Sequence, residues 1–175
     1  MRSENPTGVQ RRGAGPVASA SVGKLYLVRH ADAGPRGGRA EPDEARPLSE
    51  RGWRQADGLR DQLEDAGITQ LVASPFVRCV QTLLPLGDTL GIVVALDDRL
   101  AEGQGALGAL ALARELRGTS AVMCSHGDVI PDVLEALMAG GTRLKGELKW
   151  QKASTWVLSW DGDHLAKGKY LPPPA

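Results

Sequence analysis

Short apolar runs alternate with longer amphipathic stretches along most of this chain. The short runs are rich in aliphatic and β-branched residues and are bounded by Gly, Pro or charged residues, which is typical of strands. The longer stretches repeat their apolar residues at helical spacing, which predicts helices. These patterns predict strands at residues 25–28, 70–73, 92–96, 121–124, 154–160 and 165–170, and helices at residues 50–66, 75–90, 107–116 and 129–138.

Strands that alternate with helices indicate an α/β fold, here a three-layer α/β/α sandwich around a mainly parallel sheet. The last two strands are separated by Asp161-Gly162, a strong signal for a tight turn, which predicts an antiparallel C-terminal hairpin. Pro85 is expected to kink the second helix or end it early. Residues 33–47 and 142–152 lack a regular period and are expected to form loops that border any site on the sheet.

The length and composition limit the organisation of the chain. Its 175 residues are enough for one well-buried domain and too few for two of ordinary size. Residues 1–23 are rich in Gly, Ser, Pro, Ala and Arg without periodicity, which predicts a disordered leader. Residues 24–175 are therefore expected to form a single domain.

Charge and hydropathy narrow the class of protein. The chain has 21 Lys+Arg and 21 Asp+Glu, so its net charge gives no reason to expect nucleic acid or an anionic membrane as a partner. It has no apolar run near the roughly 18 residues of a membrane span, and residues 13–18 are too weakly apolar for a signal-peptide core. We therefore expect a cytoplasmic protein. Cys79 and Cys124 each lie in an apolar run, which favours buried free thiols over a disulfide or a metal site.

Three of the predicted strands end in residues that can do chemistry. The first runs into Arg29-His30, the second is followed by Arg78, and the fourth runs into a serine and then His126-Gly127. Because parallel strands bring their carboxyl ends to one edge of a sheet, we expect two arginines and two histidines to share one pocket.

Such a cluster suits a phosphoryl group. Arginine binds phosphate oxygens through two parallel hydrogen bonds and stays charged, and a neutral histidine nitrogen can attack phosphorus. Nearby arginines favour the neutral ring of His30 by charge repulsion. The backbone N–H groups at Gly127 and at the start of the following helix add donors for an anion.

Four segments, in this order, resemble the histidine phosphatase superfamily, the phosphoglycerate mutase-like group. They read LVRHA at 27–31, RPLSERG at 46–52, ASPFVRCVQT at 73–82 and SHGD at 125–128. Ala31 stands where many members have glycine, and the chain lacks the long insertion of the mutases and acid phosphatases. In both respects it is similar to the short single-domain branch that includes bacterial phosphohistidine phosphatases.

The resemblance implies a role for each matching residue. His30 would be the nucleophile that becomes phosphorylated, and Arg29, Arg78 and His126 would hold the phosphate oxygens, with His126 also counted among the catalytic residues. Glu102, on the loop after the third strand, would protonate the leaving oxygen, and Asp98 and Asp32 are the alternatives for this role. Neither a cofactor nor a metal is expected. Ser74, Ser125 and Asp128 are expected to cap the elements that follow them.

The expected function is that of a metal-independent phosphatase acting on a phosphorylated small molecule or on protein phosphohistidine. Two alternatives stay open: a module that binds phosphate or phosphohistidine without turnover, and a metal-dependent hydrolase. The second would use the two His-x-Asp pairs at 30–32 and 126–128, but adjacent arginines would repel a metal ion. The sequence favours no particular substrate within these classes and no oligomeric state.

Overall fold

The computed structural model describes residues 22–37 and 40–175, so the predicted leader at residues 1–23 lies almost wholly outside the described residues. The strands are β1 (Lys24–Arg29), β2 (Gln70–Ala73), β3 (Val94–Leu96), β4 (Ala121–Ser125), β5 (Arg143–Lys145), β6 (Thr155–Asp161) and β7 (His164–Leu171). The α-helices are α1 (Glu50–Leu63), α2 (Val77–Leu90), α3 (Gly105–Glu115) and α4 (Val129–Ala139), with short 3₁₀ helices η1 (Asp43–Ala45) and η2 (Asp98–Leu100).

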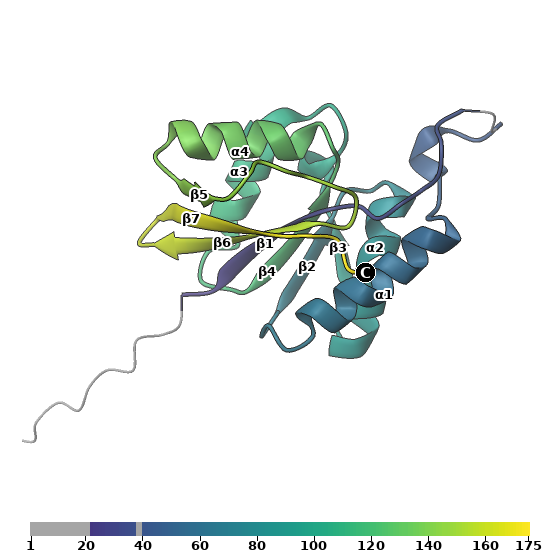
Figure 1. The fold of residues 1–175 in the computed structure, drawn as a ribbon, viewed down its shortest axis with the longest axis horizontal. Coiled ribbons are helices and arrows are strands. Elements are labelled where there is room, and N and C mark those ends of the chain that lie inside the picture. Colours follow the sequence, from purple (N-terminus) through teal and green to yellow (C-terminus); the bar gives the residue numbers. More distant parts are fainter. Residues whose placement is uncertain (1–21, 38–39) are drawn as a thin grey trace, which may run out of the picture.

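The strands form one seven-stranded sheet in the order β3-β2-β4-β1-β6-β7-β5 (Figure 1). The neighbours among β1, β2, β3 and β4 are parallel, β6 is antiparallel to both β1 and β7, and β5 is parallel to β7. The sheet is thus mainly parallel on one side and carries the predicted antiparallel hairpin on the other, where Gly162 has the positive φ of +60° that its turn requires.

Helices pack on both sides of the sheet, as the α/β/α prediction requires, although α1 and α2 cover only the half formed by β1 to β4 (Figure 1). On one face α3 and α4 pack over a cluster that includes Leu27, Met123 and Trp156. On the other face α1 and α2 pack over a cluster that includes Val28 and Val122. The two faces of β1 therefore belong to two separate apolar clusters, because successive side chains of a strand point in opposite directions.

Local chemistry explains where the helices that border the site begin and end. The Ser49 side chain accepts a hydrogen bond from the backbone N–H of Gly52 and so caps α1. Gly91, with φ +68°, ends α2 in the left-handed conformation that favours glycine. Between them, α2 continues through Pro85 without ending early, because Leu83 and Leu86 on both sides of it are fully buried and hold the helix on the sheet.

Two other expectations about the elements were wrong. The predicted loop at 142–152 contains β5, which has one apolar residue between two cations and therefore no strand pattern of its own. The third strand begins at Val94 instead of residue 92.

The predicted buried free thiols of Cys79 and Cys124 are confirmed. None of the helices that the structure describes is long and apolar enough to cross a membrane.

Candidate active site

The strand ends that were predicted to converge do so at the carboxyl edge of the sheet. Arg29 of β1 pairs in register with Ser125 of β4, and Ala73 of β2 pairs with the residue before Ser125. Backbone hydrogen bonds extend this alignment beyond the strands, because the His30 N–H donates to the Ser125 carbonyl at 3.0 Å. His30, Arg78 and His126 are brought together and are almost completely buried.

The orientation of His30 leaves one ring nitrogen free. Its Nδ1 lies 2.8 Å from the carbonyl oxygen of Ala31, and because a carbonyl can only accept, Nδ1 carries the proton. The lone pair of the neutral ring is then on Nε2. Burial lowers the pKa of His30 from 6.5 to about 3, and the positive charges of Arg78 and Arg29 act in the same direction. The ring is therefore neutral at physiological pH.

A threonine holds the backbone next to His30 in place. The Ala31 N–H donates to Thr82 Oγ1 at 2.9 Å, and Thr82 in turn donates to the Arg78 carbonyl at 2.7 Å. The hydroxyl therefore connects the backbone just after β1, where His30 lies, to the first turn of α2, which carries Arg78. Thr82 lies within the matched segment at 73–82, but its role was not predicted.

Arg78 is a fully buried cation with several partners. Its Nη1 lies 2.8 Å from the Asp43 carbonyl oxygen and 3.1 Å from Asp43 Oδ2. Its Nη2 lies 3.4 Å from both Glu102 Oε2 and His126 Nδ1. The guanidinium also lies over the ring of Phe76, 4.6 Å from its centroid. A buried charge requires such compensation, and Asp43 is the partner that the sequence analysis missed.

Arg29 is held by backbone groups. Its Nη1 donates to the Trp150 carbonyl at 2.8 Å, and its guanidinium lies directly against Gly127. A Cβ at position 127 would come within 2.6 Å of Arg29 Nη2, so the arginine can lie there only because the residue is a glycine.

Both arginines have a buried N–H donor without a partner among the described residues. Three side-chain polar atoms in the described part of the chain are buried without a hydrogen-bond partner, and Arg29 Nε and Arg78 Nε are two of them. Buried N–H groups nearly always have acceptors, because an unpaired one costs free energy. Two such groups on guanidinium ions beside His30 indicate a site for an anion.

His126 is oriented from both sides. Its Nδ1 faces Arg78, which can only donate, so Nδ1 accepts and the proton lies on Nε2. Nε2 then donates to Ser74 Oγ at 2.8 Å. The rings of His30 and His126 meet edge to face at 5.4 Å, and Phe76 packs on the other side of His126 at 4.6 Å.

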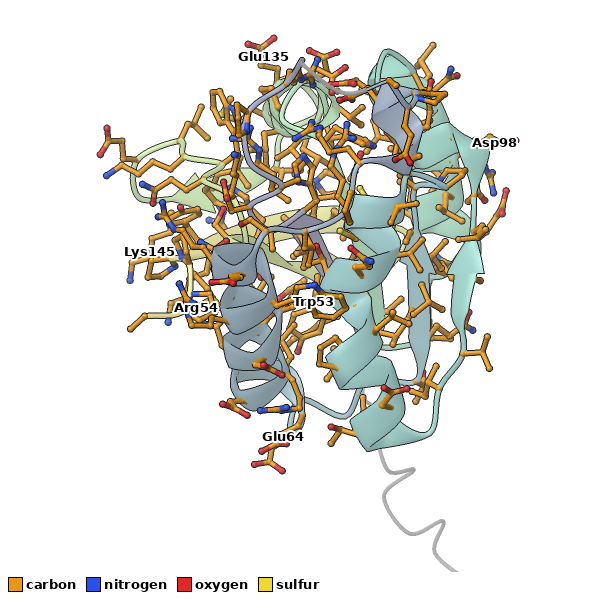
Figure 2. The ribbon with its side chains drawn as sticks, turned by 90° about the vertical axis from the view of Figure 1, so that its right-hand side faces the viewer. Trp53, Arg54, Glu64, Asp98, Glu135 and Lys145 are labelled. Atoms are coloured by element: carbon orange, nitrogen blue, oxygen red, sulfur yellow. The ribbon has the colours of Figure 1, made fainter. Side chains whose placement is uncertain are left out.

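The three acids considered for the proton donor lie in different surroundings. Glu102 lies at the site, where it pairs with Arg78 and with Arg36. Asp98 is exposed, and Figure 2 shows it at the margin of the molecule. Asp32 accepts hydrogen bonds from Ser49 and, at 2.6 Å, from Lys152, and the Lys152 hydrogen bond is the main reason that the pKa of Asp32 falls to about 2. Of the three acids, only Glu102 borders the buried arginine.

A pocket of about 610 Å³ that opens to solvent borders the site through the contact residues of Arg78 and His126. Among its lining residues are Arg36, Asp43, Phe76, Glu102 and Asp128. Arg36 and Asp43 come from the loop at 33–47, which was predicted to border the site. Within residues 22–37 and 40–175, no group of three or more His, Cys, Asp or Glu side chains is placed to hold a metal ion.

The capping expectations were wrong in detail. Asp128 occupies the N-cap position of α4, but its carboxylate accepts from the Gly103 N–H at 2.7 Å and makes no capping hydrogen bond. Ser125 donates to the Leu100 carbonyl at 2.7 Å. Ser74 makes its short contact with His126, and its contact with the Phe76 N–H is long at 3.4 Å. Asp128 and Ser125 thus hold η2 and the loop after it against the end of β4, and Ser74 holds the ring of His126.

Comparison with known proteins agrees with this geometry. A model of the histidine phosphatase superfamily (branch 1) matches residues 25–110. The 8-oxo-(d)GTP phosphatase of Mycolicibacterium smegmatis is 35% identical over 155 residues, which cover 86% of this chain and 48% of that protein. The chain thus spans about half the length of this relative.

Solved structures show the same fold. The protein histidine phosphatase SixA, complexed with tungstate, matches with a TM-score of 0.67 at 22% identity, covering 87% of this chain and 96% of that one. The mycobacterial glucosyl-3-phosphoglycerate phosphatase Rv2419c matches with a TM-score of 0.61 at 19% identity, covering 87% and 98%. The family-model match and these structural neighbours support the family that the sequence motifs resemble, the histidine phosphatase superfamily.

Proposed function

We propose that this protein is a metal-independent phosphatase that works through a covalent phosphohistidine on His30. The observation that carries the proposal is the hydrogen bond from His30 Nδ1 to the Ala31 carbonyl, which leaves the Nε2 lone pair of a neutral ring free. Two guanidinium groups with unused N–H donors border that ring and would bind the phosphoryl oxygens.

The reaction would proceed in two displacements. The Nε2 lone pair of His30 attacks phosphorus and the bond from phosphorus to the leaving oxygen breaks. That oxygen takes a proton from Glu102, which has taken it up from solvent once phosphoryl oxygens replace the carboxylate on Arg36 and Arg78. Water then attacks the phosphorus, gives its proton to the Glu102 carboxylate, and displaces His30 as the P–N bond breaks. Arg29 and Arg78 hold the phosphoryl oxygens throughout, and His126 would join them by donating from Nδ1, the nitrogen that faces Arg78 in the absence of substrate.

Glu102 is the best placed acid for this exchange. Its present partners are guanidinium groups of Arg36 and Arg78, and incoming phosphoryl oxygens would compete for the same N–H donors. The carboxyl group would then be released toward the leaving oxygen. Asp32 is engaged by Lys152 and Ser49, and Asp98 is exposed on η2, so neither has an equivalent position.

The substrate proposal follows from the pocket that borders the site. The pocket is open to solvent and His30 lies buried beyond it, so a phosphohistidine carried by a protein and a small phosphomonoester are both candidates. The names of the similar proteins suggest the compounds to test first: protein phosphohistidine, oxidised guanine nucleotides and sugar phosphates.

The test is hydrolysis of para-nitrophenyl phosphate in EDTA by the parent protein, by His30→Ala and by His164→Ala, an exposed histidine outside the site. Turnover that survives EDTA, disappears in His30→Ala and persists in His164→Ala supports the proposal. Acid-labile, base-stable labelling of the parent protein by a phosphorylated substrate would identify the intermediate as phosphohistidine.

Other results would point elsewhere. Turnover that persists in His30→Ala would show that His30 is not the nucleophile, and turnover lost in EDTA would favour a metal-dependent hydrolase. Vanadate binding without any turnover in the parent protein would favour the non-catalytic binding module. Glu102→Gln and Asp98→Asn form a matched pair, of which only Glu102→Gln should lose turnover while still binding vanadate.

A further inference from the structure

One half of the sheet has a face that no helix of the described residues covers. The cluster under α1 and α2 contains residues of β1, β2 and β4, but only Val157 from β6 and no residue of β7 or β5. The side chains of β5, β6 and β7 that point the other way, such as Leu144, Leu158 and Leu165, pack on the α3 and α4 side. The alternate residues therefore point to the uncovered face, on the side of the sheet opposite α4 (Figure 1).

The uncovered face is strongly basic. Strand register places Lys167 beside Arg143 and Lys169 beside Lys145 on the neighbouring strand. Figure 2 shows Lys145 at the margin of the molecule. A shallow hollow of about 600 Å³ lies on this face. We define the basic face as the five cations that line this hollow: Lys24, Arg143, Lys145, Lys167 and Lys169.

These charges are not neutralised by any part of the chain that the structure describes. No ion pair joins any of the five to a carboxylate among the described residues, and no Asp or Glu lines the hollow. Like charges on directly opposite strand residues destabilise a sheet. The whole chain has formal net charge +0, so these five cations form a local positive patch. An anion from outside the chain would reduce the repulsion among them.

The other residues of the hollow narrow the choice of anion. Tyr26, Leu63, Ala66, Val157 and Leu171 supply an apolar floor between the cations. A single-stranded nucleic acid would need exposed aromatic rings for stacking, but Tyr26 is the one aromatic residue of the lining and is only 6% exposed. An anionic membrane would need apolar side chains that project outward, whereas these apolar groups lie inside the hollow.

We propose that the basic face binds an acidic segment of a partner protein, with Asp and Glu side chains on the cations and an apolar side chain in the hollow. The proposal is independent of the reaction at His30. None of the five cations contributes a hydrogen bond to the residues around His30.

The test is fluorescence anisotropy of a labelled Asp- and Glu-rich peptide that contains leucines, titrated with the full chain at several salt concentrations. The parent protein should bind the peptide, more weakly as salt rises. The double variant Lys167→Gln/Lys169→Gln should weaken binding roughly tenfold, as expected for the loss of two partly exposed charges. The matched control Arg114→Gln/Arg117→Gln removes two exposed cations of the α3 region and should bind like the parent.

Further readouts separate the proposal from a folding defect and from the other anions. Turnover of para-nitrophenyl phosphate by Lys167→Gln/Lys169→Gln should equal that of the parent. Its urea midpoint should equal or exceed that of the parent, because the variant removes only repelling charges. Replacing the leucines of the peptide with serines should weaken binding. Equal weakening in both double variants, no binding by the parent, or tighter binding of an oligothymidylate or of phosphatidylserine vesicles would overturn the proposal.

Discussion

The buried neutral state of His30 predicts a measurable dependence of stability on pH. The folded protein holds the pKa of His30 at about 3, whereas an unfolded histidine titrates near 6.5. Between these values the unfolded chain binds a proton that the folded protein does not, so the free energy of unfolding falls as the pH drops below about 6.5. The loss is about 1.4 kcal/mol for each pH unit, or roughly 2 kcal/mol by pH 5.

The substitution His30→Gln removes this titration. At pH 5 the folded protein is already neutral at His30, so the whole proton uptake belongs to the unfolded state and disappears with the side chain. Between pH 8 and pH 5, His30→Gln should therefore lose roughly 2 kcal/mol less unfolding free energy than the parent protein. The other titrating groups are common to both proteins and cancel in this comparison.

Urea unfolding at pH 8 and pH 5 measures the effect, with His164→Gln as the matched control. His164 is exposed at the start of β7, so its removal should leave the pH dependence of the parent nearly unchanged. If His30→Gln and the parent lost the same free energy between the two pH values, the folded ring would be taking up the proton. The inference of a neutral nucleophile would then be wrong.

Three further substitutions test how the site is held together. Gly127→Ala should displace the Arg29 guanidinium and lower kcat/KM roughly a hundredfold with little change in the urea midpoint; unchanged kinetics would show that Arg29 does not bind the phosphoryl group. Thr82→Val should cost about 1–3 kcal/mol of unfolding free energy because it leaves the Ala31 N–H buried without an acceptor, whereas Thr82→Ser should keep most of it. Ser49→Ala should cost about 1 kcal/mol through loss of the α1 cap, measured by urea unfolding against Ser159→Ala, a half-buried serine of β6 that caps no helix.

The convergence of the candidate site residues could be predicted because it depends on two general regularities. Apolar runs locate the strands, and parallel strands in one sheet end at the same edge. Arg29 is the last residue of β1, and His30 and His126 follow β1 and β4 directly, so their placement depends only on correct strand assignment and direction. The same reasoning predicted the C-terminal hairpin, because its turn carries a local signal at Asp161-Gly162.

The contacts that hold these residues could not be predicted in the same way. Asp43 reaches Arg78 from a loop without periodicity, and the Trp150 contact with Arg29 uses a backbone carbonyl that every residue possesses. Asp128 has the sequence position of a helix cap, yet its carboxylate bonds to the Gly103 N–H on another loop. Such contacts depend on how loops far apart in sequence lie together, which no local pattern encodes.

The buried arginines connect the stability of the site to its ligand. Arg78 is fully buried and its charge is balanced by Asp43 and Glu102, yet its Nε still has no acceptor, and neither does Nε of Arg29. Leaving such donors unpaired costs free energy in the folded protein, and well-packed apolar side chains in place of the arginines would give a more stable arrangement. In the proposed reaction, the phosphoryl group beside His30 would accept hydrogen bonds from both guanidinium groups. The free energy that the unliganded protein loses at these two atoms would then contribute to its affinity for phosphate.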